Sequence, residues 1–126
     1  MMIYMKIDGI PGGVTWAPYA GWIETSVVEW IRPKKFLRGD ATEVVLNATV
    51  EFGEHSEKLQ LWHSSGRRKA YVDIRGVEYP LVKRWIYLQD VRVTWYLVTR
   101  EPGFPVRHYE TITFWATKGS VRTTAT

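Results

Sequence analysis

Apolar and polar residues alternate through most of this chain, and such alternation is typical of β-strands. The cleanest case is residues 42–52, where one face collects the apolar side chains Val44, Leu46, Ala48, Val50 and Phe52. Because successive side chains of a strand point to opposite faces, we expect this segment to show one face to a core and one to water. Segments of similar character are residues 3–8, 68–75, 81–89, 91–99 and 106–116.

Residues 22–31 differ from these segments, because their Val, Ile and Trp side chains occupy both faces. A strand of this kind is predicted to be buried on two sides. Turn residues such as Gly66, Gly76 and Pro80 separate the predicted strands. About seven strands joined by short turns predict a mainly β protein, a compact barrel or sandwich of two packed antiparallel sheets.

The segment from His55 to Gly66 fits two structures. As a short helix, it would have Ser56 as its N-cap, the acidic Glu57 in its first turn and Gly66 as its stop. The same residues also fit a strand that turns at Gly66 and pairs with the next strand, residues 69–74. The pattern of residues alone leaves both open.

Length and composition predict one domain over residues 1–126. The chain is 45% hydrophobic and 24% charged, which is enough apolar material for a core, and its polar end, residues 120–126, is expected to fray. Seven Trp and seven Tyr are many for this length, and they indicate contacts between subunits. No apolar run reaches transmembrane length and no signal sequence precedes the first strand, so we expect synthesis in the cytosol.

No arrangement of residues indicates catalysis, and we expect no enzyme activity, no cofactor and no metal. The chain has no cysteine, which excludes disulfides and thiolate ligands. His55 and His63 are two helical turns apart, a poor spacing for metal ligands, and the third histidine is His108. Glu24 and Glu110 lie within apolar strands, where we expect cross-strand pairs with Lys or Arg.

The net charge is +4, and basic residues gather in two places, residues 32–38 and residues 67–69. Basic clusters can bind nucleic acid. Neither cluster alternates with the aromatic residues on which single-stranded bases would stack. We therefore interpret them as a solvated loop and a solvated turn.

The opening residues resemble a known family. The run Lys-Ile-Asp-Gly-Ile-Pro-Gly at residues 6–12, then Gly-Trp-Ile-Glu at residues 21–24 and a strand ending in Trp30, is similar to the start of hemolysin-coregulated proteins. The order of the later segments, residues 56–66, 69–74, 90–93 and 109–114, fits the same family. This resemblance favours a helix over residues 56–65. The chain is shorter than typical members, and residues 15–19 replace their usual polar insert.

What the resemblance implies is a structural role. Members are barrel-like sandwiches with one flanking helix, and they form hexameric rings that stack into the tube of type VI secretion systems. The implied partners are further copies of the chain, spike and sheath components and effector cargo in the lumen, with no nucleic acid and no membrane insertion. The implied route is from the cytoplasm through the secretion apparatus, without a cleaved signal peptide.

Contacts between copies are expected on two aromatic residues and on the loop that follows the second of them. The residues are Trp22, Trp30, Lys34, Lys35, Phe36, Leu37 and Arg38. In the family, a loop at this place contacts the next ring, so Phe36 and Leu37 would be apolar plugs between basic residues. An ordinary hairpin loop fits the same residues.

Three other functions stay open at this point. One is a small β-barrel that binds single-stranded nucleic acid through residues 67–69 and exposed aromatic rings. The second is a tail-tube protein of a related contractile or phage system. The third keeps the fold and makes the chain a cytosolic adaptor or chaperone.

Overall fold

The computed structural model describes residues 2–33, 39–78 and 82–125, which form seven strands and one helix. The elements are β1 (Met2–Ile7), β2 (Ile23–Thr25), β3 (Val27–Arg32), β4 (Gly39–Glu51), α1 (Ser56–Ser65), β5 (Lys69–Glu78), β6 (Val82–Glu101) and β7 (Arg107–Ala125). All strand pairs are antiparallel, and the strands form one sheet in the order β2-β1-β5-β6-β7-β4-β3. The predicted class, mainly β with one short helix, is confirmed.

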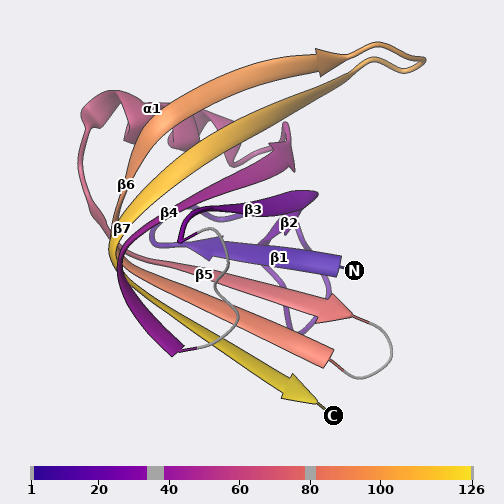
Figure 1. Cartoon of the computed structure of the whole chain (residues 1–126). Coiled ribbons are helices and arrows are strands. Elements are labelled where there is room, and N and C mark those ends of the chain that lie inside the picture. The colour runs from indigo at the N-terminus through magenta and orange to yellow at the C-terminus, as the bar shows by residue number, and fades with distance from the viewer. Residues whose placement is uncertain (1, 34–38, 79–81, 126) are drawn as a thin grey trace.

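The sheet bends sharply along one line, so that it faces itself (Figure 1). Glu43 on β4 and Asp90 on β6 have left-handed backbone angles, φ 55° and 54°, and they flank Thr117 of the central strand β7. Long strands cross this line and take part in both halves of the fold. The two predicted sheets are therefore one continuous sheet, and the segments 81–89 and 91–99 belong to the single strand β6.

We name the two halves by their outer strands. The β3 half contains β3 and residues 44–51, 107–116 and 93–101 of β4, β7 and β6. The β5 half contains β2, β1, β5 and the remaining parts of β6 and β7. Figure 1 shows the halves as the two arms of a wedge that opens away from the bend.

The hydrophobic core fills the space between the two halves. Its largest fully buried side chains include Phe114, Met5 and Leu88. The predicted core face of β4 is confirmed for Val44, Leu46, Ala48 and Val50, which are all fully buried. The prediction is wrong for Phe52, because β4 ends at Glu51 and the ring of Phe52 is exposed.

The helix α1 covers one open side of the core, and its own side chains Leu59 and Trp62 are buried against that core. Its bounds, Ser56–Ser65, confirm the helix prediction, and Gly66 ends it in a left-handed conformation with φ 64°. Ser56 is not the N-cap, since His55 holds that position. The hydroxyl of Ser56 instead donates a hydrogen bond to Glu110, 2.6 Å away.

Two further predictions are corrected by strand pairing. Residues 22–31 are not one strand buried on both sides: β2 pairs with β1, and β3 pairs with β4 at the end of the sheet. Val27 and Ile31 are exposed there. The chain end that was expected to fray is part of β7, which stays paired with β6 up to Ala125.

Gly119 lies in β7 next to the bend, where backbone and side chains approach closely. A Cβ atom at this position would lie 2.8 Å from Val44 Cγ2 and 3.2 Å from Leu88 Cδ2. We expect Gly119→Ala to lower the free energy of unfolding by about 1–3 kcal/mol, since overpacking a filled core forces its neighbours to shift. Urea denaturation tests this, with the exposed Lys118→Ala as control. Equal stability of the two variants would contradict the close approach.

Candidate functional site

The β3 half of the sheet ends in two edges that lack a strand partner among the described residues. One is the outer edge of β3, the last strand in the order of the sheet. The other is the far part of β6, because β5 pairs with β6 only as far as Val91. An unpaired edge presents backbone N–H and C=O groups that can pair with another strand.

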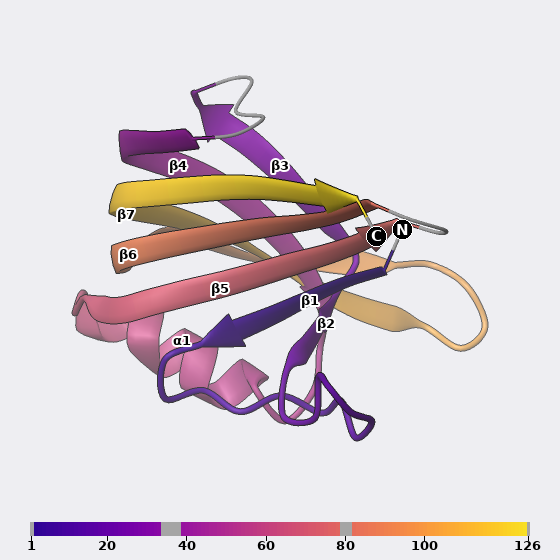
Figure 2. The same ribbon diagram turned by 90° about the horizontal axis from the view of Figure 1, so that it is seen from below.

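The helix α1 lies beside the first part of this β6 edge. Gln60 Nε2 donates a hydrogen bond to the Tyr96 hydroxyl at 3.3 Å, and the His63 ring stacks on Tyr96 with 5.9 Å between centroids. Past Tyr96, β6 and β7 extend beyond the barrel as a hairpin (Figures 1 and 2). We call residues 97–109 the distal hairpin.

Exposed apolar side chains gather at both edges. On β3, Val27 is 52% exposed and Ile31 is also exposed. On β6, the exposed residues are Trp95, at 57%, together with Leu97 and Val98. Apolar side chains of this size beside unpaired backbone are typical of surfaces that another chain covers.

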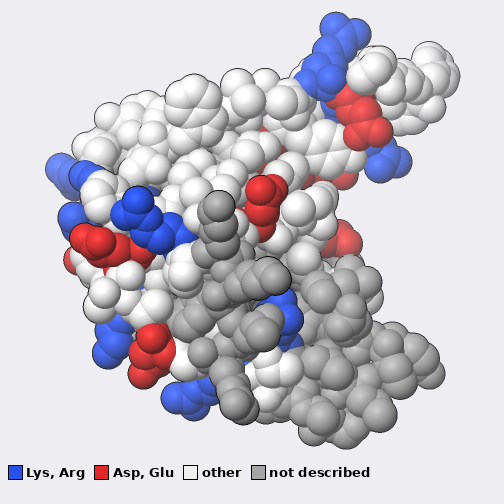
Figure 3. All heavy atoms as spheres, viewed as in Figure 1, with Lys and Arg blue, Asp and Glu red and all other residues white. Residues whose placement is uncertain are grey.

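The tip of the distal hairpin carries a fully exposed ring, Phe104, next to charged residues of both signs. Figure 3 shows these charges at the end of the hairpin, while the surface behind it is largely uncharged. The base of the hairpin and β3 enclose a shallow groove of about 530 Å³ that includes Val27, Thr99 and Tyr109. The two edges of the β3 half are thus joined by a hollowed outer face.

This outer face of the β3 half is polar and internally hydrogen-bonded. Thr49 and Thr111 share a hydrogen bond of 3.3 Å between their hydroxyls, across β4 and β7. Thr113 donates to Asn47 Oδ1 at 2.6 Å on the same pair of strands. The middle of the face therefore carries hydroxyl and amide groups, with Val45 and Trp115 nearer the bend, and its exposed apolar side chains lie at the edges.

Of the residues expected to contact other copies, Trp22 and Trp30 have partners within their own chain. Trp22 is half-buried, edge-on to Tyr19 and with the Arg75 guanidinium 5.4 Å from its ring. Trp30 packs against the core from β3. The loop residues Lys34, Lys35, Phe36, Leu37 and Arg38 lie outside the described residues. The structure does not bring Trp22 to the two edges.

The sequence pattern did not predict that the far part of β6 forms an edge of the sheet. Its only signal is the run Trp-Tyr-Leu-Val at residues 95–98, which is apolar on both faces of a strand. That pattern also fits a strand buried on both sides. Only the strand pairing shows that, among the described residues, this part of β6 has no strand neighbour on one side.

A buried carboxylate joins the helix to the β3 half. Glu110 on β7 is fully buried, and it accepts hydrogen bonds from the hydroxyls of Ser56 and Tyr96. His55 Nε2 lies 3.2 Å from its Oε1 atom. Burial alone would raise the pKa of Glu110, but the contacts from His55, Ser56 and Tyr96 outweigh it and the pKa is lowered. The expected cross-strand pair of Glu110 with Lys or Arg is wrong.

The same cluster raises the pKa of Tyr96, whereas it lowers the pKa of Glu110. Burial and the hydrogen bond to the Glu110 carboxylate raise the pKa of the Tyr96 hydroxyl well above its ordinary value. The raised pKa keeps the Tyr96 hydroxyl protonated at neutral pH, so it can donate to the carboxylate. The cluster links α1, β6 and β7 at the place where the distal hairpin leaves the barrel.

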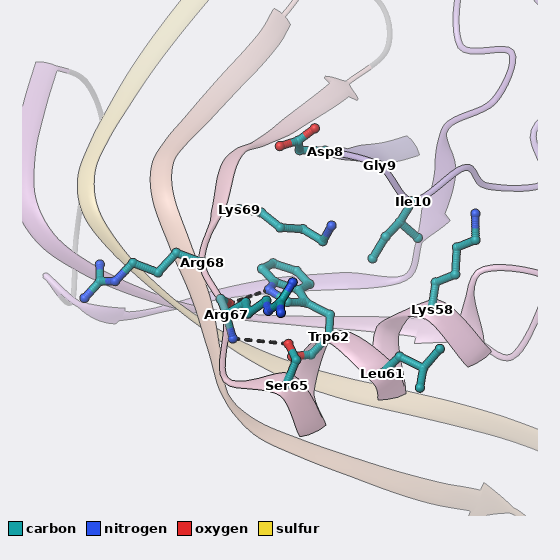
Figure 4. Close-up of a pocket in the computed structure, with 10 residues that line it drawn as sticks. All are labelled: Asp8, Gly9, Ile10, Lys58, Leu61, Trp62, Ser65, Arg67, Arg68 and Lys69. Atoms are coloured by element: carbon teal, nitrogen blue, oxygen red, sulfur yellow. Dashed lines mark hydrogen bonds between the residues drawn. The ribbon is translucent and has the colours of Figure 1, made fainter.

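A second surface feature is a basic groove of about 670 Å³ at the C-terminal end of α1 (Figure 4). The groove is lined by Lys58 and Trp62 of α1, by Arg67 of the following turn, by Lys69 at the start of β5 and by Asp8 after β1. Arg68 points away from its centre and pairs with Asp90 at 3.0 Å. Among the described residues there is no group of three His, Asp or Glu side chains that could hold a metal ion.

The groove does not have the form of a base-stacking site. Its one ring, Trp62, is only 4% exposed, and Lys69 Nζ lies 5.6 Å from the ring centroid. The indole N–H donates to the Arg67 carbonyl at 2.8 Å, which fixes the ring under the turn. Stacking of single-stranded bases needs an exposed ring face. This geometry speaks against the nucleic-acid alternative at residues 67–69.

A single bent antiparallel sheet closed by one helix, with two edges of one half unpaired in the described part of the chain, defines a small β-barrel-like fold. Solved structures with this fold include Hcp1 from Salmonella typhimurium, with a TM-score of 0.75, 17% identity and coverage of 95% of this chain and 83% of that one. Hcp3 from Pseudomonas aeruginosa has a TM-score of 0.62 at 16% identity, covering 98% and 97% of the two chains.

A type VI secretion system effector from Yersinia pestis also shares the fold, with a TM-score of 0.69, 19% identity and 98% coverage of both chains. No family model and no curated protein matches the sequence. The chain therefore has the fold of Hcp proteins, as the opening residues predicted. No helix within the described part of the chain is long and apolar enough to cross a membrane.

Proposed function

We propose that this chain is the tube subunit of a type VI secretion system, and that copies join edge to edge into rings. The observation that carries the proposal is the pair of edges at opposite sides of the β3 half that have no strand partner in the described part of the chain, both lined by exposed apolar residues. In the proposed contact, the outer edge of β3 in one copy pairs with the far part of β6 in the next.

Such a contact joins two different surfaces, the β3 edge of one copy and the β6 edge of the next. Each copy that joins therefore offers a further edge to another copy. Heterologous contacts of this kind close into a ring when the rotation between neighbours fits a whole number of copies. The fold of Hcp proteins and the resemblance of residues 6–30 support a hexameric ring. Closure also covers both of these edges in every copy, which stabilises the assembly against open aggregation.

The ring gives the outer face of the β3 half a role. Once the edges are paired, the β3 halves of all copies form one continuous wall, and the hydrogen-bonded threonines and Asn47 lie along it. We place this polar wall at the lumen, where it would pass or hold cargo with little adhesion. Rings stacked into a tube would leave the cell through the secretion apparatus, with spike and sheath components as further partners.

Light scattering coupled to size-exclusion chromatography tests the proposal. A mass about six times that of the 14.7 kDa chain is expected, together with ring-shaped particles in negative-stain electron microscopy. A strictly monomeric chain at high protein concentration would overturn it. The loop residues 34–38 remain candidates for contacts between stacked rings.

A further inference from the structure

We infer that the basic groove beside the C-terminal end of α1 binds a second copy of this chain, through an acidic groove at the opposite end of the same helix. The inference rests on the proposed function, because it assigns the surfaces through which one ring stacks on the next. It concerns surfaces other than the β3 and β6 edges.

The basic groove has more cations than its own chain neutralises. Neither Lys58 nor Arg67 has an ion-pair partner among the described residues, and Lys69 lies over Trp62 and beside Gly9. The carboxylate of Asp8 already accepts a hydrogen bond from the Ala70 N–H at 3.2 Å. The groove thus offers three ammonium or guanidinium groups to carboxylates from outside.

The acidic groove, of about 390 Å³, lies where α1 begins. Glu24, Glu51 and Glu54 line it, together with the exposed rings of Trp16 and Phe52. Tyr109 first and Glu51 after it raise the pKa of Arg107, so Glu51 already has a cation nearby. Glu24 and Glu54 are exposed and have no ion-pair partner among the described residues. An acidic groove with an apolar rim matches a basic groove that includes Leu61 and Ile10.

The positions of the two grooves fit contacts between stacked rings, and they do not fit contacts between neighbouring copies within one ring. The helix runs from the open end of the wedge to the bend (Figures 1 and 2). The basic groove lies between α1 and residues 8–10, and the acidic groove between residues 13–16 and residues 51–55, just before α1. They follow one another along the helix: the acidic groove reaches His55, just before α1, and the basic groove extends from Lys58 to the turn after Ser65. The β3 and β6 edges are separated across the strands. Contacts between grooves therefore leave the plane of the ring.

Charge reversal in each groove tests the inference. The variants are Lys58→Glu with Arg67→Glu, Glu24→Lys with Glu54→Lys, and the combination of all four substitutions. Stacked rings are counted by negative-stain microscopy and followed by sedimentation, while light scattering reports the mass of the single ring. Each double variant is expected to weaken stacking roughly tenfold or more, and the combined variant to restore it. Lys118→Glu, an exposed lysine of β7 outside both grooves, serves as control.

The outcomes separate this inference from the proposed function. Wild-type rings that stay single at low salt, or double variants that stack like the control, overturn the groove contact while the ring stands. Chains that form no ring at all overturn the proposed function itself. Wild-type binding of a single-stranded oligonucleotide that is lost in the Lys58→Glu, Arg67→Glu variant would make the groove a nucleic-acid site, and would also overturn the inference.

Discussion

Replacing Leu97 by aspartate is expected to break the ring into monomers without unfolding the chain. Leu97 lies on the free part of β6 and is 45% exposed in the single chain, so its own fold gains little from it. In the proposed ring it packs beside β3 of the next copy, where Val27 and Ile31 are exposed. A buried charge there costs about 2 kcal/mol or more at each interface, and every interface of a closed ring carries the change.

Light scattering measures the result as a fall from the mass of the ring to 14.7 kDa. The matched control is Gln89→Asp, which adds the same charge at an exposed position of the same strand. At Gln89, β6 has neighbours on both sides, β5 and β7, and this position is remote from the free edge. A Leu97→Asp variant that keeps the ring mass would exclude the far part of β6 from the contact.

Replacing Glu110 by glutamine is expected to lower the free energy of unfolding at pH 7 by about 2–4 kcal/mol. Glutamine keeps the volume, but its amide N–H₂ group faces groups that donate, the hydroxyls of Ser56 and Tyr96. The lost charge also leaves His55 beside a neutral side chain. Urea denaturation measures the loss, and Glu101→Gln, an exposed glutamate at the end of β6, is the control.

The pH dependence gives this prediction a second readout. Because the pKa of Glu110 in the folded chain lies below its ordinary value of 4.5, the ionised carboxylate stabilises the fold above that value. This contribution is lost as the pH falls from 4.5 through the lowered pKa. The stabilities of wild type and Glu110→Gln should therefore converge in acid. A constant difference between them down to pH 3 would show that the charge of Glu110 does not stabilise the fold.

The alternation of apolar and polar residues was sufficient to predict the strands that bury one face against the core. The core face of β4 follows from its period of two, because each inward side chain meets the same core. The alternation did not predict the helix over Ser56–Ser65, because these residues fit a strand equally well. The resemblance to hemolysin-coregulated proteins favoured the helix, which the structure confirms. Gly66 stops the helix because a glycine adopts φ 64° without strain.

The same alternation failed where burial depends on neighbours that are distant in the sequence. Residues 22–31 are apolar on both faces, yet β3 ends the sheet and exposes one of them. Glu110 sits in an apolar strand, and its partners come from α1 and β6 and include no lysine or arginine. The pattern of residues within one strand does not predict which residues of another element will pack against it.

The residue pattern thus predicts the class of fold, and the resemblance of the first thirty residues predicts the helix and the likeness to Hcp folds. Three features follow from the folded chain alone: three strands bend at one line, β6 extends beyond its partner β5, and two edges of one half have no strand partner among the described residues. Periodicity reports which face of a strand is apolar, whereas a free edge depends on how far neighbouring strands extend. That length is set by long-range pairing, and the assembly we propose depends on it.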